Sequence, residues 1–370
     1  MKRPTNGKRL DQSDKPRWIR RRQWLRRRAL KLAHRKRWKR HCGTHGDKAL
    51  SHLNRHTKKT VRLNTDRKLE IRLPARLDFE ENYEETVSHF AVLRRATRSG
   101  RRVKELSFDA ISFISPSAAL VLASEVDCWN QIIGGRLRAQ DHRWDENIKR
   151  LLIEMGYFEL LGLKRPDSLA PRKSMTFLPF VRSGIDERNP GKLAKSLRHS
   201  IEEVVGKKIK KQFLFEGLSE AMTNVAQHAY PEHDRFKLQQ WWLSASYDDE
   251  GRSLSVTFYD QGEGIPRTLP SSKIFEQIKA AFSVWSDSQK IEAAMEVGRS
   301  ATNRKERGKG LKNFIEFART HREGRLSIFS LRGRYRIEWK RDGNQIFETT
   351  NRQDHENSIG GTLIEWSVKL

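Results

Sequence analysis

The sequence predicts a protein of the α/β class: an α+β two-layer sandwich on the C-terminal side, preceded by a smaller domain and a basic N-terminal extension. Its 370 residues are enough for two domains and a tail. Basic residues are concentrated in the first 60 positions, and the helix and strand patterns that follow them fall into two groups. We therefore expect three parts, which are residues 1–65, 66–170 and 171–370.

The N-terminal extension carries most of the positive charge of the chain. Residues 1–60 contain 22 Lys and Arg against three Asp, which is +19 of a formal net charge of +28. We expect a partly disordered or helical tail whose cations neutralise phosphates and whose Trp18, Trp24 and Trp38 stack on bases. Nucleic acid, either DNA or RNA, is therefore its predicted partner. The alternatives are a solvated tail, or a segment that docks on an acidic protein or membrane surface.

Four side chains that can bind metal lie near the end of the extension, at Cys42, His45, His52 and His56. One thiolate and three imidazoles can hold a zinc ion. The alternative is that these histidines belong to a basic tail without a metal. Both interpretations stay open.

Several features predict a cytoplasmic protein that does not enter a membrane. The two cysteines, Cys42 and Cys128, lie far apart, which indicates a reducing compartment rather than a disulfide framework. No apolar run reaches the roughly 20 residues that a membrane span needs. The N-terminus has no apolar stretch of the kind found in secretory signals.

Residues 66–170 have alternating strand and helix patterns. We expect, in order, a strand at 68–74, a helix at 79–98, a buried strand from 104, a helix at 118–129, a short strand at 136–139, a helix at 147–155 and a closing segment at 157–163. Ser115 or Ser117 is expected to cap the helix at 118–129, because short hydroxyl side chains accept the first N–H groups of a helix.

This order of elements resembles the STAS domain of bacterial anti-anti-sigma factors. In that family a phosphorylated serine stands at the turn after the central strand, usually within Asp-Ser-Ser. The matching stretch here is ISPSA (114–118), which lacks the acidic residue and contains a proline. The resemblance implies Ser115 or Ser117 as a phosphoacceptor. The alternatives are a helix cap without chemistry, and a STAS-like domain that serves only to dock a protein partner.

Residues 171–370 are expected to place helices on one face of a mixed sheet. We expect helices at 193–205, 213–229 and 310–321, strands at 237–247, 253–259, 325–331, 334–340 and 362–370, a turn at 248–251 and a polar loop at 298–307.

Three segments of this part carry the chemistry. In EAMTNVAQHA (220–229), helical spacing places Glu220, Asn224 and His228 on one face. DQGEGI (260–265) is a tight glycine turn at the end of an apolar run, and RGKGL (307–311) follows it. No Walker A sequence is present, so a P-loop nucleotide site is not expected.

Together the three segments resemble the N, G1 and G2 boxes of the histidine-kinase-like (Bergerat, or GHKL) ATPase domain, and EAMTN is typical of anti-sigma factor serine kinases. The resemblance implies that ATP and Mg²⁺ are the cofactors. It implies that Asn224 binds Mg²⁺ and that Glu220 is the general base. Asp260 would accept a hydrogen bond from the adenine amino group. Gly262 and Gly264 would let the backbone pass close to the base.

The remaining predicted ATP contacts come from the G2-like segment and the last strand. Gly308, Lys309, Gly310 and Leu311 would meet the phosphates through backbone N–H groups and a helix N-terminus. Lys312 replaces the usual last glycine, and it either adds a phosphate contact or disturbs close packing. Thr362 would complete the adenine pocket. His228 either touches phosphate or lies on a helix surface.

The sequence thus predicts a Mg-dependent ATP-binding protein. It either hydrolyses ATP as a conformational or regulatory switch or transfers phosphate to a protein serine, and a homodimer fits either scheme. The alternatives are an ATP sensor without turnover, and a nucleic-acid-binding regulator that uses the ATPase fold as a scaffold.

Overall fold

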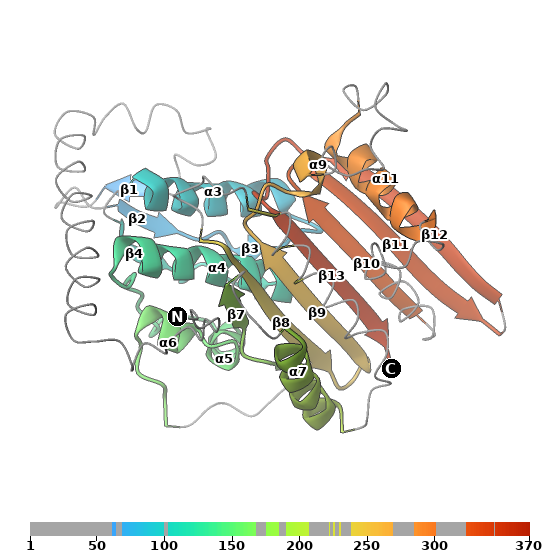
Figure 1. Ribbon diagram of the computed structural model, residues 1–370. Helices are drawn as coiled ribbons and strands as arrows, with labels where there is room; N and C mark the ends of the chain where they lie inside the picture. The colour runs from blue at the N-terminus through green and yellow to red at the C-terminus, as the bar shows by residue number, and fades with distance from the viewer. Residues whose placement is uncertain are drawn as a thin grey trace, which may run out of the picture. The chain divides into compact units, whose positions relative to one another are not determined.

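The computed structural model describes residues 61–63, 69–99, 103–167, 175–184, 190–206, 222, 225, 229–230, 238–268, 285–300, 323–343 and 345–370 (Figure 1). They all belong to one of two units into which the chain divides, Lys59–Leu370. The basic extension, with the zinc candidates Cys42, His45, His52 and His56, lies outside the described residues. The predicted boundary at residue 170 stays a prediction.

The part before this boundary, residues 61–167, is called here the N-terminal part. Its strands are β1 (Val61–Leu63), β2 (Leu69–Arg72), β3 (Arg76–Leu77), β4 (Val103–Ser107) and β5 (Phe113–Ile114), and its helices are α3 (Tyr83–Ser99), α4 (Pro116–Ile133), α5 (Glu146–Glu154) and α6 (Tyr157–Leu161). The three-stranded sheet has the order β1-β2-β4, and β3 pairs with β5. The expected strand at 136–139 is reduced to one bridge between Glu105 and Arg138.

Local signals explain both ends of α4. The Ser115 hydroxyl accepts from the backbone N–H of Ala118 at 3.3 Å, and Pro116, whose fixed φ suits the first turn, follows it. The helix ends at Gly134, which has the left-handed conformation that ends many helices. Ser115 is therefore the cap that the sequence predicts, and Ser117 is a buried residue of the first turn.

The C-terminal part is built on an eight-stranded sheet. Its strands are β6 (Met175–Phe177), β7 (Val181–Gly184), β8 (Gln240–Asp248), β9 (Ser253–Asp260), β10 (Glu323–Ser330), β11 (Gly333–Asp342), β12 (Gln345–Asp354) and β13 (Thr362–Lys369). The order is β12-β11-β10-β13-β9-β8-β6, and β7 also pairs with β8. Every described pairing in this sheet is antiparallel, so the predicted mixed sheet is wrong.

Three described helices accompany the large sheet: α7 (Pro190–Val205), α9 (Ile265–Thr268) and α11 (Asp287–Ser300). The helix α7 agrees with the expected helix at 193–205. The helix α11 and the strand β12 were not expected, and α11 runs into the start of the predicted polar loop. The sequence of β12 has no apolar alternation because both of its faces are exposed.

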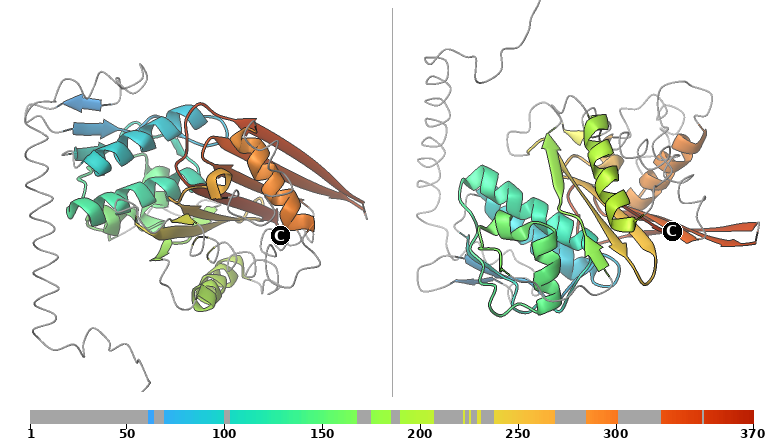
Figure 2. Two further views of the ribbon diagram at one scale, coloured as in Figure 1. Left: turned by 45° about the horizontal axis from the view of Figure 1, so that its top comes forward. Right: turned by 90° about the horizontal axis from the view of Figure 1, so that it is seen from below.

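Alternation of side chains along β9 shows that the sheet has two buried faces. Val256 and Phe258 belong to a core shared with Ile201 of α7 and Ile291 of α11. Tyr259 points to the opposite face, where it meets the N-terminal part. The sheet is thus the middle of three layers, with α3 and α4 on one side and α7 and α11 on the other (Figure 2). The two layers predicted for residues 171–370 are the sheet and the helices α7 and α11, and the third layer comes from the N-terminal part.

The turn before α3 and the first residue of the helix, Tyr83, cover β10 and β11. The ring centroids of Phe79 and Phe329 are 5.6 Å apart, and the ring of Tyr83 stacks on Phe329 at 5.9 Å. Beside them Glu80 forms ion pairs with Arg334, at 3.3 Å, and with Arg336. Apolar and charged contacts therefore both hold the N-terminal part on the sheet.

Among the helices of the described residues, none is both long and apolar enough to cross a membrane.

The N-terminus of α11 depends on Asp354, at the end of β12. Its Oδ1 accepts from the Ser288 backbone N–H at 2.9 Å, and its Oδ2 accepts from the Ser288 hydroxyl at 2.6 Å. Burial raises the pKa of the Asp354 carboxyl, but hydrogen bonds from Ser286 and Ser288 outweigh this and hold the pKa below its usual value.

We predict that Asp354→Ala lowers the free energy of unfolding at pH 7 by about 1 kcal/mol, as for the loss of a helix cap. A lowered folded-state pKa stabilises the fold above the unfolded pKa of about 3.9, and this stabilisation is lost as pH falls through the folded value. Urea unfolding from pH 7 into the acid range should therefore show the difference shrinking. Asp342→Ala, at the exposed tip of the same hairpin, is the control. A difference independent of pH would contradict the assignment.

Candidate nucleotide site at the end of strand β9

Asp260 is the last residue of β9 and lies opposite Thr362, the first residue of β13. Their exposed fractions are 4% and 6%. Side chains directly opposite each other in an antiparallel pair have Cβ atoms about 5 Å apart. The structure therefore brings together the two residues that the sequence predicts for the adenine pocket, on the face covered by α7 and α11.

The turn after Asp260 is held by hydrogen bonds from its own backbone. Gly262 N–H donates to Asp260 Oδ1 at 2.7 Å, which orients the carboxylate. The other bonds go from Gln261 N–H to the Tyr230 hydroxyl at 3.0 Å, from Glu263 N–H to the Ala229 carbonyl at 2.7 Å and from Ile265 N–H to Ser330 Oγ at 2.9 Å. With four N–H groups bonded to the protein, the turn has a fixed shape before any ligand binds.

The two glycines of the turn make room for the protein itself. A Cβ on Gly262 would lie 2.5 Å from the Ala229 carbonyl oxygen. Gly264 has a φ of +83°, and a Cβ there would lie 2.9 Å from Ser330 Oγ. Packing thus accounts for both glycines. The role that the sequence assigns them, close passage along a base, stays a prediction.

Ala229 connects two of the three predicted motifs, because it is the last residue of the segment 220–229 and its carbonyl receives Glu263 N–H. Met222 and Val225 of the same segment are buried against the sheet. The residues with predicted metal, base and phosphate roles lie outside the described residues: Glu220, Asn224, His228, Gly308, Lys309, Gly310 and Leu311.

Sequence reasoning missed three residues that shape the site. Ser330 lies opposite Thr362 on β10, and the two hydroxyl oxygens are 3.1 Å apart. Tyr230 holds the turn through its hydroxyl. Burial raises the pKa of this hydroxyl, and the nearby Asp260 raises it further, so the hydroxyl stays protonated. Gln261 points to the opposite face. Of these three residues, the sequence indicates only Gln261. Side chains alternate between the two faces of a strand, so the residue after Asp260 points away from the site.

The candidate phosphoacceptors lie in the N-terminal part. Ser115 is half-buried and its hydroxyl caps α4, whereas Ser117 has an exposed fraction of 3%. Their hydroxyl oxygens are 3.3 Å apart. A phosphate on Ser117 would require the start of α4 to move, so Ser115 is the more accessible of the two.

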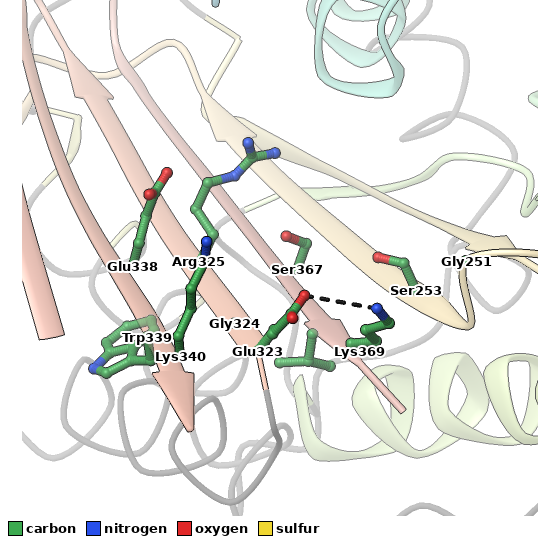
Figure 3. A pocket seen from close by; sticks show the side chains of 11 residues that line it. Gly251, Ser253, Glu323, Gly324, Arg325, Glu338, Trp339, Lys340, Ser367 and Lys369 are labelled. Carbon is green, nitrogen blue, oxygen red and sulfur yellow. Dashed lines mark ion pairs between the residues drawn. The ribbon is translucent and has the colours of Figure 1, made fainter. Parts of the chain in front are cut away.

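An open hollow lies at the other end of the strands (Figure 3). Ser253 and Lys369 line it, seven residues along β9 and β13 from the pair Asp260 and Thr362. Its charged side chains include Lys369 and Glu323, which pair at 3.8 Å, and Arg325, which pairs at 3.3 Å with Glu365 outside the lining. The hollow is therefore separate from the candidate nucleotide site.

In the described part of the chain, no group of three or more His, Cys, Asp or Glu side chains is arranged to hold a metal ion. No protein-family model matches the sequence, and no curated protein matches it.

We predict that Gly262→Ala lowers the free energy of unfolding by about 1–3 kcal/mol, the usual cost of overpacking. The added methyl would meet the Ala229 backbone, which cannot move as a flexible side chain can. Gly135→Ala is the matched control, because no atom lies within 4 Å of a Cβ at that position. Urea unfolding of both variants checks this. Equal effects at the two positions would contradict the close approach.

Proposed function

We propose that this protein binds ATP with Mg²⁺ at the end of β9. The observation that carries the proposal is the buried carboxylate of Asp260, oriented by Gly262 N–H and placed opposite the hydroxyl of Thr362. A carboxylate has about four acceptor positions, so a single side chain of this kind can accept from more than one donor. This set of groups suits a flat heterocycle with an exocyclic amine, which is the chemistry of adenine.

The metal and phosphate contacts would come from residues 220–229 and 307–311. Met222, Val225 and Ala229 are buried at helical spacing. In the α-helix that the sequence predicts for this segment, Glu220, Asn224 and His228 would share another face. Asn224 would hold Mg²⁺ through its amide oxygen, and residues 308–311 would contact phosphate through backbone N–H groups. When bound, Mg²⁺ would spread the charge of the phosphates.

Glu220 is the proposed general base, one helical turn before Asn224. It would take a proton either from water, which gives hydrolysis and a conformational switch, or from a serine hydroxyl, which gives phosphate transfer. In both reactions the bond between the γ-phosphorus and the β–γ bridging oxygen breaks, and ADP leaves.

We predict that Asp260→Asn weakens Mg-ATP binding at least tenfold, because it removes a charged acceptor for the adenine amine. The wild type should also prefer ATP to GTP, since guanine presents a carbonyl where adenine has its amine, and the variant should lose this preference. Titration calorimetry with both nucleotides measures this. The exposed Asp249→Asn is the control. A wild type that binds neither nucleotide would refute the proposed function.

Turnover is tested with γ-labelled ATP and Mg²⁺, comparing the wild type with Glu220→Ala. We predict that the wild type releases labelled phosphate or labels a protein serine, and that the variant loses at least 100-fold in rate, as is typical for a general base. The variant should still bind ATP. Binding without turnover in the wild type would contradict catalysis and favour the sensor.

A second proposed function, nucleic-acid binding, rests on the charge of +19 in residues 1–60. We predict that affinity for a fluorescent DNA or RNA oligonucleotide falls steeply with salt, because phosphate contacts release counterions. Deletion of residues 1–58, one of the two units of the chain, should abolish this binding. Fluorescence anisotropy at several salt concentrations checks both points. Affinity that is insensitive to salt, or that survives the deletion, would contradict this role.

A further inference from the structure

The two loops that border the proposed nucleotide site both touch the N-terminal part. The β9 loop, residues 260–264, begins with Asp260. The β13 loop, residues 355–361, leads into Thr362. Helices α3 and α4 contact these loops from the side of the sheet opposite α7 and α11 (Figure 2).

Helix α3 binds the β13 loop through its first turn. The Glu84 carboxylate accepts from the backbone N–H groups of Glu356 at 2.8 Å and Asn357 at 3.1 Å, and from the Asn357 side-chain amide at 2.8 Å. The Tyr83 hydroxyl donates to the Asn357 carbonyl at 3.2 Å. The same loop bonds to the turn between β10 and β11, from His355 N–H to the Arg332 carbonyl at 2.8 Å and from Ile359 N–H to the Leu331 carbonyl at 2.9 Å, so α3 and this turn together place it.

Arg94, farther along α3, joins four elements at one point. Its Nε donates to Glu125 of α4 at 2.8 Å, and its Nη2 donates to the Ile359 carbonyl at 2.8 Å and to the Tyr259 hydroxyl of β9 at 3.2 Å. Burial alone would lower the pKa of Arg94, but the Glu125 carboxylate outweighs it and raises the pKa, so the guanidinium stays charged. The planar guanidinium of arginine carries five N–H donors, so one side chain can donate hydrogen bonds to several acceptors at once.

Two glycines carry the contact from Arg94 to Asp260. A Cβ on Gly360 would overlap the Arg94 guanidinium, and a Cβ on Gly361 would lie 2.9 Å from the carbonyl carbon of Asp260. The backbone of the β13 loop therefore fits between the buried arginine and the residue proposed to bind adenine. Glu125, Arg94, the two glycines and Asp260 form one continuous series of contacts.

Gln261 makes a second, separate connection. Its side chain accepts from the Cys128 thiol of α4 at 3.2 Å and donates to Ser124 Oγ at 3.5 Å. Burial raises the pKa of the Cys128 thiol well above its usual value, so the sulfur keeps the proton that it donates. Neighbouring residues of one turn thus face opposite ways, Asp260 to the proposed ligand and Gln261 to α4.

We propose that Arg94 and Gln261 are positioning residues of the nucleotide site, through which α3 and α4 hold the β13 and β9 loops at the spacing that nucleotide binding needs. This inference rests on the proposed ATP site. Because linkage is reciprocal, bound nucleotide would in turn hold α3 and α4 more firmly on the sheet. A protein partner that shifted either helix would change the affinity for nucleotide.

The test is titration of the full chain with Mg-ATP by calorimetry, using Arg94→Lys and Gln261→Met. Lysine keeps the charge but not the fork of donors, and methionine keeps the length of glutamine but neither polar atom. Each variant should raise the Kd of Mg-ATP about tenfold. Glu80→Gln is the matched control, because Glu80 joins the same two parts through Arg334 and Arg336 of β11, outside both loops. Its Kd should stay within about twofold of wild type.

Stoichiometry separates positioning from loss of fold. An irreversibly misfolded fraction binds less ATP at an unchanged Kd, whereas a misplaced loop raises the Kd at an unchanged stoichiometry. A reversibly unfolded fraction would also raise the apparent Kd, so urea unfolding of each variant must show that it is fully folded under the conditions of the titration. Should Arg94→Lys fail to fold, Gln261→Met alone carries the test. A wild type without ATP binding overturns the proposed function. If the wild type binds ATP and the folded variants keep the wild-type Kd, the positioning role alone is overturned. The same conclusion follows if Glu80→Gln raises the Kd as much as the two variants do.

Discussion

The alternation of side chains along β9, in a sheet that is buried on both faces, is the constraint on which the rest of the structure depends. Val256, Phe258 and Asp260 lie on the face covered by α7 and α11, and Tyr259 and Gln261 lie on the face covered by α3 and α4. A slip of one residue in register would exchange the two sets. The proposed ligand face and the N-terminal part are therefore fixed by the same strand.

Burying this second face costs free energy unless its polar groups find partners. Glu125 and Asp127 of α4 have exposed fractions of 1% and 2%. Glu125 pairs with Arg94, and Asp127 accepts from Trp242 Nε1 at 3.1 Å and pairs with Arg182. Removing one member of a buried pair typically costs about 3–5 kcal/mol, much more than an apolar replacement of both. Breaking either pair would leave a buried carboxylate without its cation, so these contacts favour one position of α4 beneath the β9 loop.

Elements that are marked by neighbouring residues can be predicted from the sequence. Elements that depend on contacts with residues far away in the chain cannot. The strands β8, β9 and β13 are recognisable from their apolar runs, and Ser115 and Pro116 mark the start of α4. The strand β12 gives no such signal because its faces are exposed, and α11 begins where Ser288 N–H donates to Asp354, which lies 66 residues away. The same limit applies to the site. Asp260 and Thr362 are found from short motifs, whereas Arg94 is one of 74 Lys and Arg, and its partner Ile359 lies 265 residues away.

The central claim is that a nucleotide site at the end of β9 is backed by the N-terminal part. Hydrogen–deuterium exchange of the full chain, with and without saturating Mg-ATP, tests it most directly. The account predicts that ATP slows exchange in the β9 loop, in the β13 loop and in α4, and leaves the exposed strand β12 unchanged. Exchange that ATP slows in β12 but not in the two loops, or that ATP does not slow at all, would contradict it.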